Sequence, residues 1–345
     1  MTPSHVDFYR GRRVMITGGL GFIGSNLARN LVELGADVLL MDSLIPDSGA
    51  NFFNIAGIAD RVRVNIADVR QESTMNHLVR DREVIFNLAG QVSHIDSMRD
   101  PYTDLEINCR SQLSILEACR KNNPRVKVVF AGTRQVYGKP DSLPVTEDHL
   151  VRPADVNGIN KAAGENYHLL YNNVFNVRAC SLRLTNVYGP RQLIKHNRQG
   201  FIGWFIRLAL EGAEIQIFGD GSQVRDFVYV EDAADAFLRA GASDTVNGKV
   251  FNVGGSEPTS HSDLVKLLID VAGAGRARHV PWPPEKKVID IGSFYANSSR
   301  LRDAVGWQPR VSLRAGLTRT IEYYRAHLSA YLDEPAPAPA PSHVA

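Results

Sequence analysis

Cysteine is scarce in this chain of 345 residues, and the few cysteines follow no ligand or disulfide pattern. Cys109, Cys119 and Cys180 are an odd number, with no Cys-x-x-Cys and no Cys/His spacing. Such a set excludes a disulfide framework and a cysteine-based metal site. We therefore expect reduced thiols, no metal and a cytoplasmic location.

Long hydrophobic runs and an excess of either charge are also missing. No apolar stretch reaches the roughly 20 residues that a membrane-spanning helix needs, and residues 1–13 lack the apolar core of a signal peptide. The 39 basic and 37 acidic residues nearly cancel, which leaves no electrostatic footprint for nucleic acid or an anionic membrane. We expect a soluble protein that binds neither nucleic acid nor a membrane.

The stretch VMITGGLGFIG, from Val14 to Gly24, has the order strand, glycine turn, helix. In a dinucleotide-binding fold, Gly18 permits the tight turn and Gly21 lets the backbone approach a pyrophosphate. Gly24 lets the helix pack closely on the strand. The N-terminus of that helix directs free N–H groups and a positive dipole end at the phosphates.

An acidic residue follows at the distance that this interpretation needs. The next strand, DVLLMD, ends in Asp42, eighteen residues after Gly24. A carboxylate there accepts both hydroxyls of the adenosine ribose, which favours NAD over NADP. A glycine-rich turn followed by a strand-capping Asp is the alternative. Because strand, helix, strand and acid occur in order, the sequence predicts that the chain binds NAD.

Segments typical of strands and helices alternate through the first half of the chain. Further strands are predicted at 62–68, 84–90 and 127–133, and helices at 72–80 and 101–121. This alternation predicts an α/β fold, with a doubly wound parallel sheet of the Rossmann type and helices on both faces. Ligands bind outside the carboxyl ends of such strands.

The second half is less regular. Helices are predicted at 155–171, 200–210, 260–271 and 313–328, and a proline-broken loop at 279–287. The length of the chain indicates two lobes or one enlarged domain. Residues 333–345 are rich in proline and alanine, so we expect a disordered tail there.

Taken together, the motifs resemble those of the extended short-chain dehydrogenases, and among them the nucleotide-sugar epimerases and dehydratases typified by UDP-galactose 4-epimerase. The motifs are TGGLGFIG, NLAGQVS, AGTRQVYG, a helix with Lys161, LRLTNVYGP and IFGDGSQVRDFVYVEDAADA. The resemblance runs from Arg12 to Tyr324. It implies an NAD-binding domain over 1–185, a smaller, mainly substrate-binding lobe over 186–330 with interleaved elements, and a homodimer through the helices at 101–121 and 155–171.

The resemblance also implies a chemistry. In this family NAD takes a hydride from a sugar carbon while a base takes the hydroxyl proton, and the hydride then returns. The base is the tyrosine of a Tyr-x-x-x-Lys pair, and a Ser or Thr hydroxyl holds the substrate oxygen. In this chain Lys161 and Thr133 match the Lys and Ser/Thr positions, whereas Asn157 stands at the position of the tyrosine.

An asparagine amide is not a general base, and losing a positioned acid or base typically costs about 10²–10⁴ in rate. Three interpretations follow. Another group is the base: Lys161, a water held by Asn157 and Thr133, or a tyrosine such as Tyr137 or Tyr188. Alternatively, Asn157 polarises a carbonyl in a step that needs no strong base. Finally, the site is redox-silent and the chain only binds NAD and a nucleotide sugar.

The residues after Thr133 narrow the reaction. The family's 4,6-dehydratases carry an Asp–Glu pair where this chain has Arg134 and Gln135, and the decarboxylases usually carry a Glu at the position of Gln135. Neither residue supplies a carboxylic acid. The resemblance therefore favours epimerisation of a nucleotide-diphosphate sugar, preferably a UDP-sugar, through a transient keto sugar. An oxidoreductase that releases a keto sugar and a catalytically silent binding protein are the alternatives.

The resemblance assigns the other cofactor contacts to short segments. They are Phe22 and Ile23 in the glycine turn, Asp68 and Val69 as an adenine-binding pair, Leu88, Ala89, Gly90 and Gln91 under the pyrophosphate and nicotinamide ribose, and Lys161 on that ribose. Small residues in such turns allow close approach of the backbone. For Asp68 the alternative is a cap of the following helix.

On the substrate side, Asn186 and Arg225 match the residues that contact the diphosphate of the nucleotide sugar. A guanidinium fork suits that contact. For Arg225 the alternative is an ion pair with Asp226 or Glu231.

Three more positions are candidates for the substrate pocket. The family's Arg-x-Gly-Asp element appears here as Lys287 to Asp290, and lysine keeps the charge but loses the fork. His94 follows the NLAGQVS turn and could reach the sugar. A structural histidine is the alternative for His94.

Overall fold

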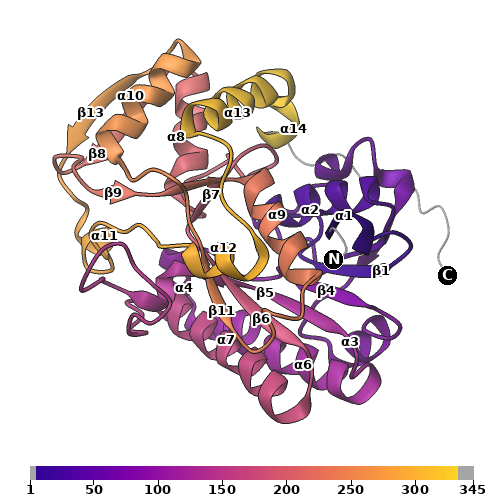
Figure 1. The fold of residues 1–345 in the computed structure, drawn as a ribbon. Helices are drawn as coiled ribbons and strands as arrows, with labels where there is room; N and C mark the ends of the chain where they lie inside the picture. The colour runs from indigo at the N-terminus through magenta and orange to yellow at the C-terminus, as the bar shows by residue number, and fades with distance from the viewer. Residues whose placement is uncertain (1–4, 333–345) are drawn as a thin grey trace.

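The computed structural model describes residues 5–332. Its centre is a seven-stranded parallel sheet with the strand order β11–β6–β5–β4–β1–β2–β3 (Figure 1). The strands are β1 (Arg13–Thr17), β2 (Asp37–Asp42), β3 (Val62–Ile66), β4 (Val84–Asn87), β5 (Lys127–Thr133), β6 (Ala179–Leu184) and β11 (Val250–Val253). Because β1 has β2 on one side and β4 on the other, the strand order reverses there, and ligands bind at such switch points.

Helices cover both faces of the sheet. In Figure 1, α3 (Glu72–Leu78), α6 (Ser111–Asn122) and α7 (Val156–Phe175) lie below it, and α2 (Phe22–Glu33) and α9 (Val230–Gly241) lie above. This doubly wound arrangement confirms the predicted fold class.

The apolar run of β1 supplies the cores on both faces, because successive side chains of a strand point in opposite directions. Val14 and Ile16 share one buried cluster with Phe237 of α9. Met15, between them, shares another with Ile115 of α6. All three β1 side chains are fully buried. The run therefore fixes the position of the glycine turn that follows it.

The helix predicted at 101–121 is interrupted. It consists of α5 (Pro101–Leu105), a π-helical turn η3 (Glu106–Arg110) and α6. Such turns are frequent at functional sites. The turn contains Asn108, which contributes to the site described below.

The second lobe, at the top of Figure 1, has a core of its own. It contains α8 (Phe201–Leu210), β8 (Glu214–Phe218), α10 (His261–Ala272), β13 (Arg276–Val280), α13 (Leu313–His327) and α14 (Ser329–Leu332). The prediction of a loop at 279–287 is wrong at both ends. β13 extends to Val280, and α11 covers Pro284–Lys287. The first four residues of β13 are exposed, so the strand, paired with β8, shows no alternating apolar pattern.

Two segments beyond residue 185 belong to the sheet layer: α9 packs against α2, and β11 extends the sheet beside β6. The boundary placed at 185/186 stays a prediction, and the predicted tail 333–345 lies outside the described residues.

The remaining elements are α1 (His5–Phe8), η1 (Phe52–Ile55), η2 (Ala59–Arg61), α4 (His94–Arg99), η4 (Arg134–Tyr137), β7 (Asn186–Tyr188), β9 (Val224–Arg225), β10 (Phe227–Tyr229), β12 (Thr259–Ser260) and α12 (Ser299–Val305).

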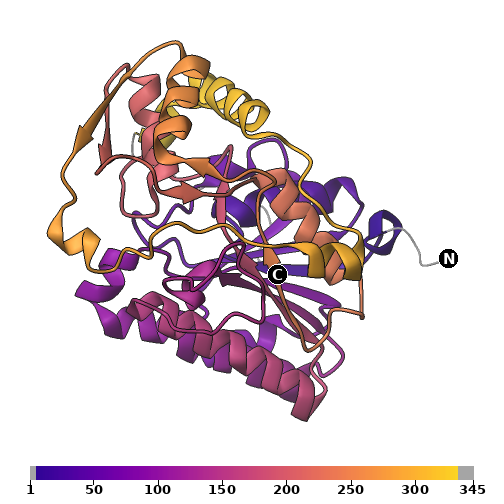
Figure 2. The ribbon, with the colours of Figure 1, turned by 60° about the vertical axis from the view of Figure 1, so that its left-hand side comes forward.

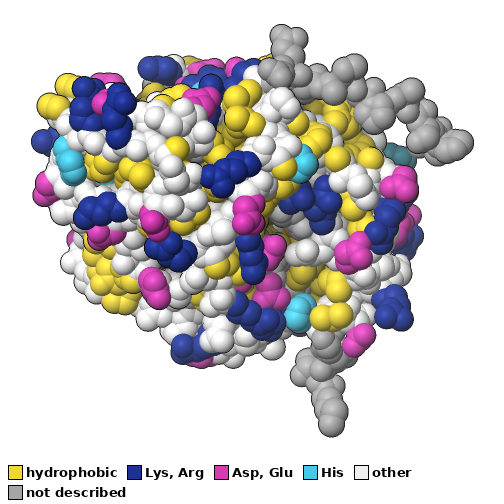
Figure 3. Space-filling model, turned by 90° about the horizontal axis from the view of Figure 1, so that it is seen from above, with side chains coloured by type: hydrophobic (Ala, Val, Ile, Leu, Met, Phe, Trp, Pro, Cys, Tyr) yellow, Lys and Arg dark blue, Asp and Glu magenta, His cyan; other side chains and the backbone are white. Residues whose placement is uncertain are grey.

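The second view of the ribbon shows α7 running along the underside of the sheet layer, with the second lobe above it (Figure 2). On the face seen in Figure 3, basic and acidic side chains are interspersed. Among the helices of residues 5–332, none is both long and apolar enough to cross a bilayer.

Candidate active site

A cleft opens at the carboxyl ends of β1, β2, β4 and β5. Every residue predicted for the cofactor or for catalysis lines it: Gly18, Gly21, Phe22, Ile23, Gly24, Asp42, Asp68, Val69, Leu88, Ala89, Gly90, Gln91, Thr133, Asn157 and Lys161. The four residues predicted for the substrate, Asn186, Arg225, Lys287 and Asp290, do not line it. The fold thus brings the first two groups together in one cavity.

The glycine turn depends on missing side chains. Gly18 has a φ of +68°, which L side chains rarely adopt. A Cβ on Gly24 would lie 2.2 Å from the carbonyl oxygen of Gly18, so α2 reaches its present position only with glycine there. Gly21 is the N-cap of α2 and gives it no side-chain cap, which leaves N–H groups of the first turn available to a ligand.

Asp42 lies at the end of β2, buried at the edge of the cleft. Its two carboxylate oxygens accept N–H groups from Leu20 at 3.1 Å and Leu44 at 3.0 Å. Burial raises the pKa of Asp42 above its ordinary value, while these backbone bonds oppose the shift. A fixed, buried carboxylate at this place suits ribose hydroxyls and would repel a 2′-phosphate.

Asp68 does not cap the helix that follows it. The N-cap of α3 is Gln71, and the Asp68 carboxylate instead accepts from Arg70, through its backbone N–H at 2.8 Å and its guanidinium. That side-chain hydrogen bond lowers the pKa of Asp68. The capping alternative is therefore wrong, and an adenine contact stays a prediction.

The turn after β4 is organised by a residue that sequence reasoning missed. The Thr17 hydroxyl accepts the N–H groups of Leu88 and Ala89, both at 3.1 Å. A Cβ on Gly90 would lie 2.8 Å from Lys161 Nζ and 2.9 Å from Asn108 Oδ1, so a side chain at residue 90 would displace one or both of these groups.

Asn157 and Lys161 are one turn apart on α7 and both face the cleft. Lys161 is buried, and its Nζ donates to the carbonyl oxygen of Ala131 at 3.2 Å. Burial lowers the pKa of Lys161 to about 8, against an opposing attraction from Asp104. The two side chains therefore have the spacing that the family's Tyr-x-x-x-Lys pair requires.

Asp104 is a fully buried carboxylate behind Asn157, and sequence reasoning missed it. It accepts from Nδ2 of Asn157 and Asn108, both at 3.0 Å, and from Nδ2 of Asn160 at 2.8 Å. Asn157 Nδ2 also donates to the carbonyl oxygen of Gln91 at 2.8 Å. The Asn157 amide nitrogen is thus held inward, and its oxygen is left for a ligand. The one-turn spacing of Asp104 and Asn108 is a signal that could have found this network.

Arg134 links the end of β5 to the second lobe. Its guanidinium donates to Gln135 Oε1 at 3.3 Å and to Asn186 Oδ1 at 3.2 Å. Burial lowers the pKa of Arg134 to about 9, and the nearby charge of Arg225 adds to the shift. The Thr133 hydroxyl accepts the N–H of Gln135 at 3.3 Å. Thr133 and Asn186, predicted for different roles, are therefore connected through Gln135 and Arg134.

Arg225 is buried and held by backbone oxygens. Its Nη1 donates to the carbonyl oxygens of Gly292 and Val224, and its Nη2 lies 3.7 Å from Asp290. The predicted alternative partners are otherwise engaged, since Glu231 pairs with Arg319 and Asp226 accepts backbone N–H groups.

The nitrogen Nε of Arg225 is buried without a partner within the described residues. Lys287 lies exposed on α11. The phosphate roles of Arg225 and Lys287 stay predictions.

Neither tyrosine proposed as a replacement base reaches the cleft. Tyr137 is buried and donates to Asn252 Oδ1 at 2.7 Å, and Tyr188 donates to the carbonyl oxygen of Leu313 at 3.2 Å. Burial raises the pKa of Tyr137 to about 12 and that of Tyr188 further still. The expectation that one of them is the base is wrong, because both phenols are committed elsewhere and hard to ionise.

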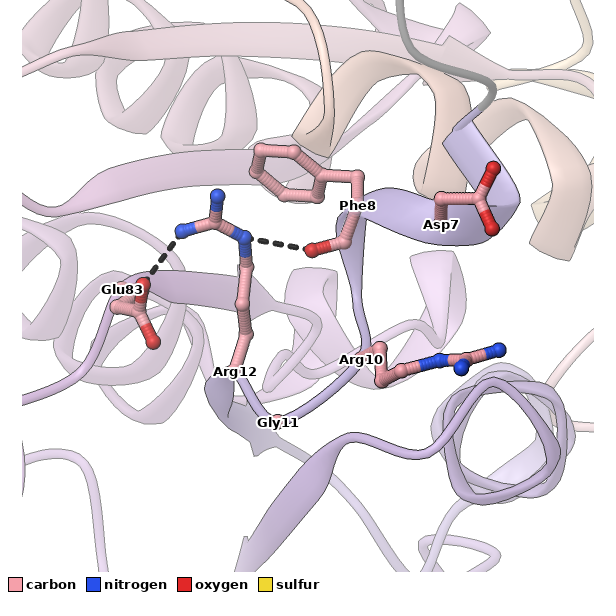
Figure 4. A pocket seen from close by; sticks show the side chains of 6 residues that line it. All are labelled: Asp7, Phe8, Arg10, Gly11, Arg12 and Glu83. Carbon is pink, nitrogen blue, oxygen red and sulfur yellow. Dashed lines mark hydrogen bonds and ion pairs between the residues drawn. The ribbon is translucent and has the colours of Figure 1, made fainter.

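A second hollow lies at the opposite, amino-terminal ends of the strands (Figure 4). Arg12 crosses it and donates to Glu83 and to the carbonyl oxygen of Phe8. Arg12 and Glu83 are thus paired with each other, at the edge of the sheet where ligands do not usually bind.

The fold and the cleft define a Rossmann-type protein of the class that binds nicotinamide dinucleotides. The chain belongs to the NAD-dependent epimerase/dehydratase family, which matches residues 14–254. A UDP-glucose 4-epimerase of Mycolicibacterium smegmatis is 35% identical over 317 residues, covering 91% of this chain and 98% of that protein.

Solved structures of relatives have the same fold. A UDP-glucose 4-epimerase of Thermotoga maritima, crystallised with UDP-glucose, superimposes with a TM-score of 0.84 at 31% identity, covering 92% of this chain and 99% of that one. One from Thermus thermophilus, in complex with NAD, gives 0.81 at 30% identity, with 91% and 99% covered. Relatives at 26–30% identity include dTDP-glucose 4,6-dehydratases and a UDP-N-acetyl-α-D-glucosaminuronate decarboxylase, so the family carries out several reactions.

NAD is the cofactor of this family, and the residues of the cleft fit it. The uncapped N-terminus of α2 would hold the pyrophosphate. Asp42 would hold the adenosine ribose and Lys161 the nicotinamide ribose. When bound, NAD accepts a hydride from a substrate carbon and can return it.

Proposed function

We propose that the chain epimerises a nucleotide-diphosphate sugar, preferably a UDP-sugar, through a transient keto sugar, with the hydride recycled on bound NAD. The observation that carries this proposal is the composition of the cleft. Thr133 and Lys161 line it together with a complete set of cofactor residues. The residues after Thr133 are Arg134 and Gln135, which cannot supply the carboxylic acid that dehydration needs.

In this proposal Asn157 occupies the place of the family's tyrosine and does not move a proton. Its nitrogen is held by Asp104 and Gln91, so its oxygen accepts a hydrogen bond from the substrate. Thr133 orients the reacting oxygen. Arg134, beside Asn186 and Arg225, supports the diphosphate electrostatically.

A silent binding protein is the second candidate, because the amide at position 157 lacks the acid/base function of tyrosine. An oxidoreductase that releases a keto sugar is the third. Exchange of bound cofactor for free NAD distinguishes this oxidoreductase from an epimerase, since only the oxidoreductase needs free NAD at every turnover.

The test is incubation of the purified protein with UDP-, GDP-, CDP- and dTDP-sugars in D₂O, followed by NMR and by absorbance near 340 nm. Epimerisation predicts a new sugar without deuterium at carbon and transient reduction of the bound cofactor. Deuterium at carbon would mean proton abstraction beside a carbonyl instead. Tight binding of one sugar without turnover would contradict the enzyme and support the silent binder.

We also propose a homodimer through the helices below the sheet. An apolar stripe is exposed on α7, where Ile159, Leu170 and Val174 are about half exposed, and Tyr102 of α5 is 78% exposed. Exposed apolar patches of this kind mark interaction surfaces. A partner helix pair would cover this stripe.

A further inference from the structure

His94 is a titratable side chain of the cleft, and both of its ring nitrogens lie close to a polar atom of a neighbouring side chain. It begins α4 and lines the cleft with Thr133 and Asn157. Its side chain is 32% exposed, whereas the side chain of Asp155, against which it lies, is 2% exposed. The imidazole therefore faces the cavity with a buried carboxylate behind it.

The contacts of the ring determine which nitrogen carries the proton. His94 Nδ1 lies 3.0 Å from Asp155 Oδ2, and Nε2 lies 2.9 Å from Gln135 Nε2. An amide nitrogen only donates, so His94 Nε2 is the acceptor and the proton is on Nδ1. This is the tautomer that a general base needs. His94 Nδ1 lies at ion-pair distance from Asp155 without hydrogen-bond geometry.

The orientation of Gln135 is itself fixed. Its Oε1 accepts from Arg134 Nη1 at 3.3 Å, which turns the NH₂ group toward His94. Arg134 is held in turn by Asn186. A chain of hydrogen bonds thus runs from β7 to the imidazole and ends on its Nε2.

Asp155 is fixed from the other side. It is the N-cap of α7, and its Oδ1 accepts the N–H of Gly158 at 2.7 Å. Burial pushes its pKa up, but the neighbouring His94, the Gly158 N–H and the charge of Arg134 together keep the pKa below its ordinary value. The carboxylate is ionised and can stabilise an imidazolium, as the third member of a catalytic triad does.

We propose that His94 is the acid/base of this cleft, in place of the tyrosine absent at position 157, and that Asp155 is its positioning residue. The inference rests on the proposed epimerisation and names the group that moves the proton. The sugar hydroxyl takes the place of the Gln135 N–H at His94 Nε2, its O–H bond breaks, and the proton goes to that nitrogen. The hydrogen of the same carbon leaves as a hydride for the bound NAD, and a C=O bond forms. On return of the hydride, the imidazolium gives its proton back to the oxygen.

Lys161 is the competing candidate, and its surroundings argue against it. Its Nζ donates to the carbonyl oxygen of Ala131 and lies 4.9 Å from the centre of the Phe130 ring. The side chain is buried, whereas that of His94 is open to the cavity. In this proposal Lys161 holds the cofactor and His94 moves the proton.

Three variants test the dyad. His94→Gln removes the base while keeping a polar side chain. His94→Gly opens space for added imidazole. Asp155→Asn removes the charge but keeps a good N-cap for α7. The matched control is His77→Gln, an exposed histidine on α3.

The measurements are substrate binding by calorimetry and the rate of reduction of bound NAD in a single turnover. His94→Gln should lower that rate by about 10²–10⁴ with less than threefold change in substrate Kd. Added imidazole should restore the reduction rate of His94→Gly. It should not raise the rate of the wild type or of Asp155→Asn. Asp155→Asn should lower the rate less than His94→Gln, and His77→Gln should behave as wild type.

A spectroscopic readout is independent of turnover. In ¹⁵N-labelled protein without substrate, the His94 signal, assigned by its loss in His94→Gln, should show an unprotonated Nε2, and Asp155→Asn should shift it. A His94→Gln variant that retains full activity, or a protonated Nε2, would overturn the dyad and leave epimerisation standing. A wild type that turns over no sugar would overturn both.

Discussion

The two sides of the cleft follow the family's pattern to different degrees. On the cofactor side, the glycine turn, Asp42 and the Leu88–Gln91 turn all match the resemblance and all line the cavity. On the side where the proton must move, Asn157, Arg134 and Gln135 all depart from it. Under the proposed epimerisation, this difference means that hydride handling is retained, whereas proton handling depends on other groups in the same cavity.

The largest effect is expected on the cofactor side, from Gly24→Ala. The added Cβ would lie 2.2 Å from the Gly18 carbonyl oxygen, so α2 must move away from β1. We expect loss of most bound NAD and a cost of about 1–3 kcal/mol in the free energy of unfolding. NAD released from the purified protein and urea unfolding measure the two effects.

Gly21→Ala is the matched control, since its Cβ would come no nearer than 3.2 Å to the same oxygen. It should cost less stability, and it serves as the control for unfolding only, because its Cβ lies where the backbone approaches the pyrophosphate. A Gly24→Ala variant that retains a full complement of NAD would contradict the claim that the close packing of α2 at Gly24 is needed for the cofactor.

On the proton side, Asp104→Asn should destabilise the protein by about 1–3 kcal/mol, because buried amide donors lose their charged acceptor. Asp104 accepts from three asparagine side chains, and an amide cannot replace all of these bonds without placing its own NH₂ against a donor. Urea unfolding measures the change. Asp60→Asn, at an exposed position, should stay within about 0.5 kcal/mol of wild type. Equal stability of both variants would mean that the network does not hold Asn157.

Lys161 makes stability depend on pH in a defined direction. Its folded pKa is lowered to about 8 from 10.5 by burial, so the unfolded chain binds more protons between these values. Wild-type stability relative to Lys161→Met should therefore rise with pH across that window, by up to about 3 kcal/mol. Urea unfolding at several pH values measures the difference. A difference that stays constant, or falls as pH rises, would contradict the buried cationic state.

The smallest effect on the fold is expected outside both sides of the cleft, at Val174. Val174→Glu places a charge on the exposed stripe of α7, so it should halve the mass in sedimentation while changing the free energy of unfolding by less than about 0.5 kcal/mol. Val288→Glu, at a residue 84% exposed in the second lobe, is the control and should remain dimeric. If Val174→Glu remained a dimer, the interface would have to lie on another surface.

The sequence predicted the parts of the molecule that have a strong local signal. Apolar runs ending in glycine or acid located β1, β2 and β5, and the motifs located the residues that line the cofactor side. It missed β13, whose residues are exposed and follow no alternating pattern. The sequence also contained no sign of the π-helical turn, because the apolar residues of 101–121 follow helical spacing on both sides of the turn.

The proton side was harder to predict because its contacts join residues distant in the chain. Asp155 has no distinctive neighbours in the sequence, Asp104 stands out only by its one-turn spacing from Asn108, and His94 only by following the NLAGQVS turn. They acquire a chemical environment only when α4, α5 and α7 pack together. The two tyrosines failed as candidates for the same reason, since only the packing shows that their hydroxyls are bound elsewhere.

The most direct test compares the wild type with Asn157→Tyr on the nucleotide sugar that the wild type turns over or binds most tightly, following product by NMR and bound cofactor at 340 nm. If proton handling has moved to other groups, the wild type is active without the tyrosine, and Asn157→Tyr brings little or no gain. An inert wild type, with activity appearing only in Asn157→Tyr, would contradict the account and leave a silent binding protein.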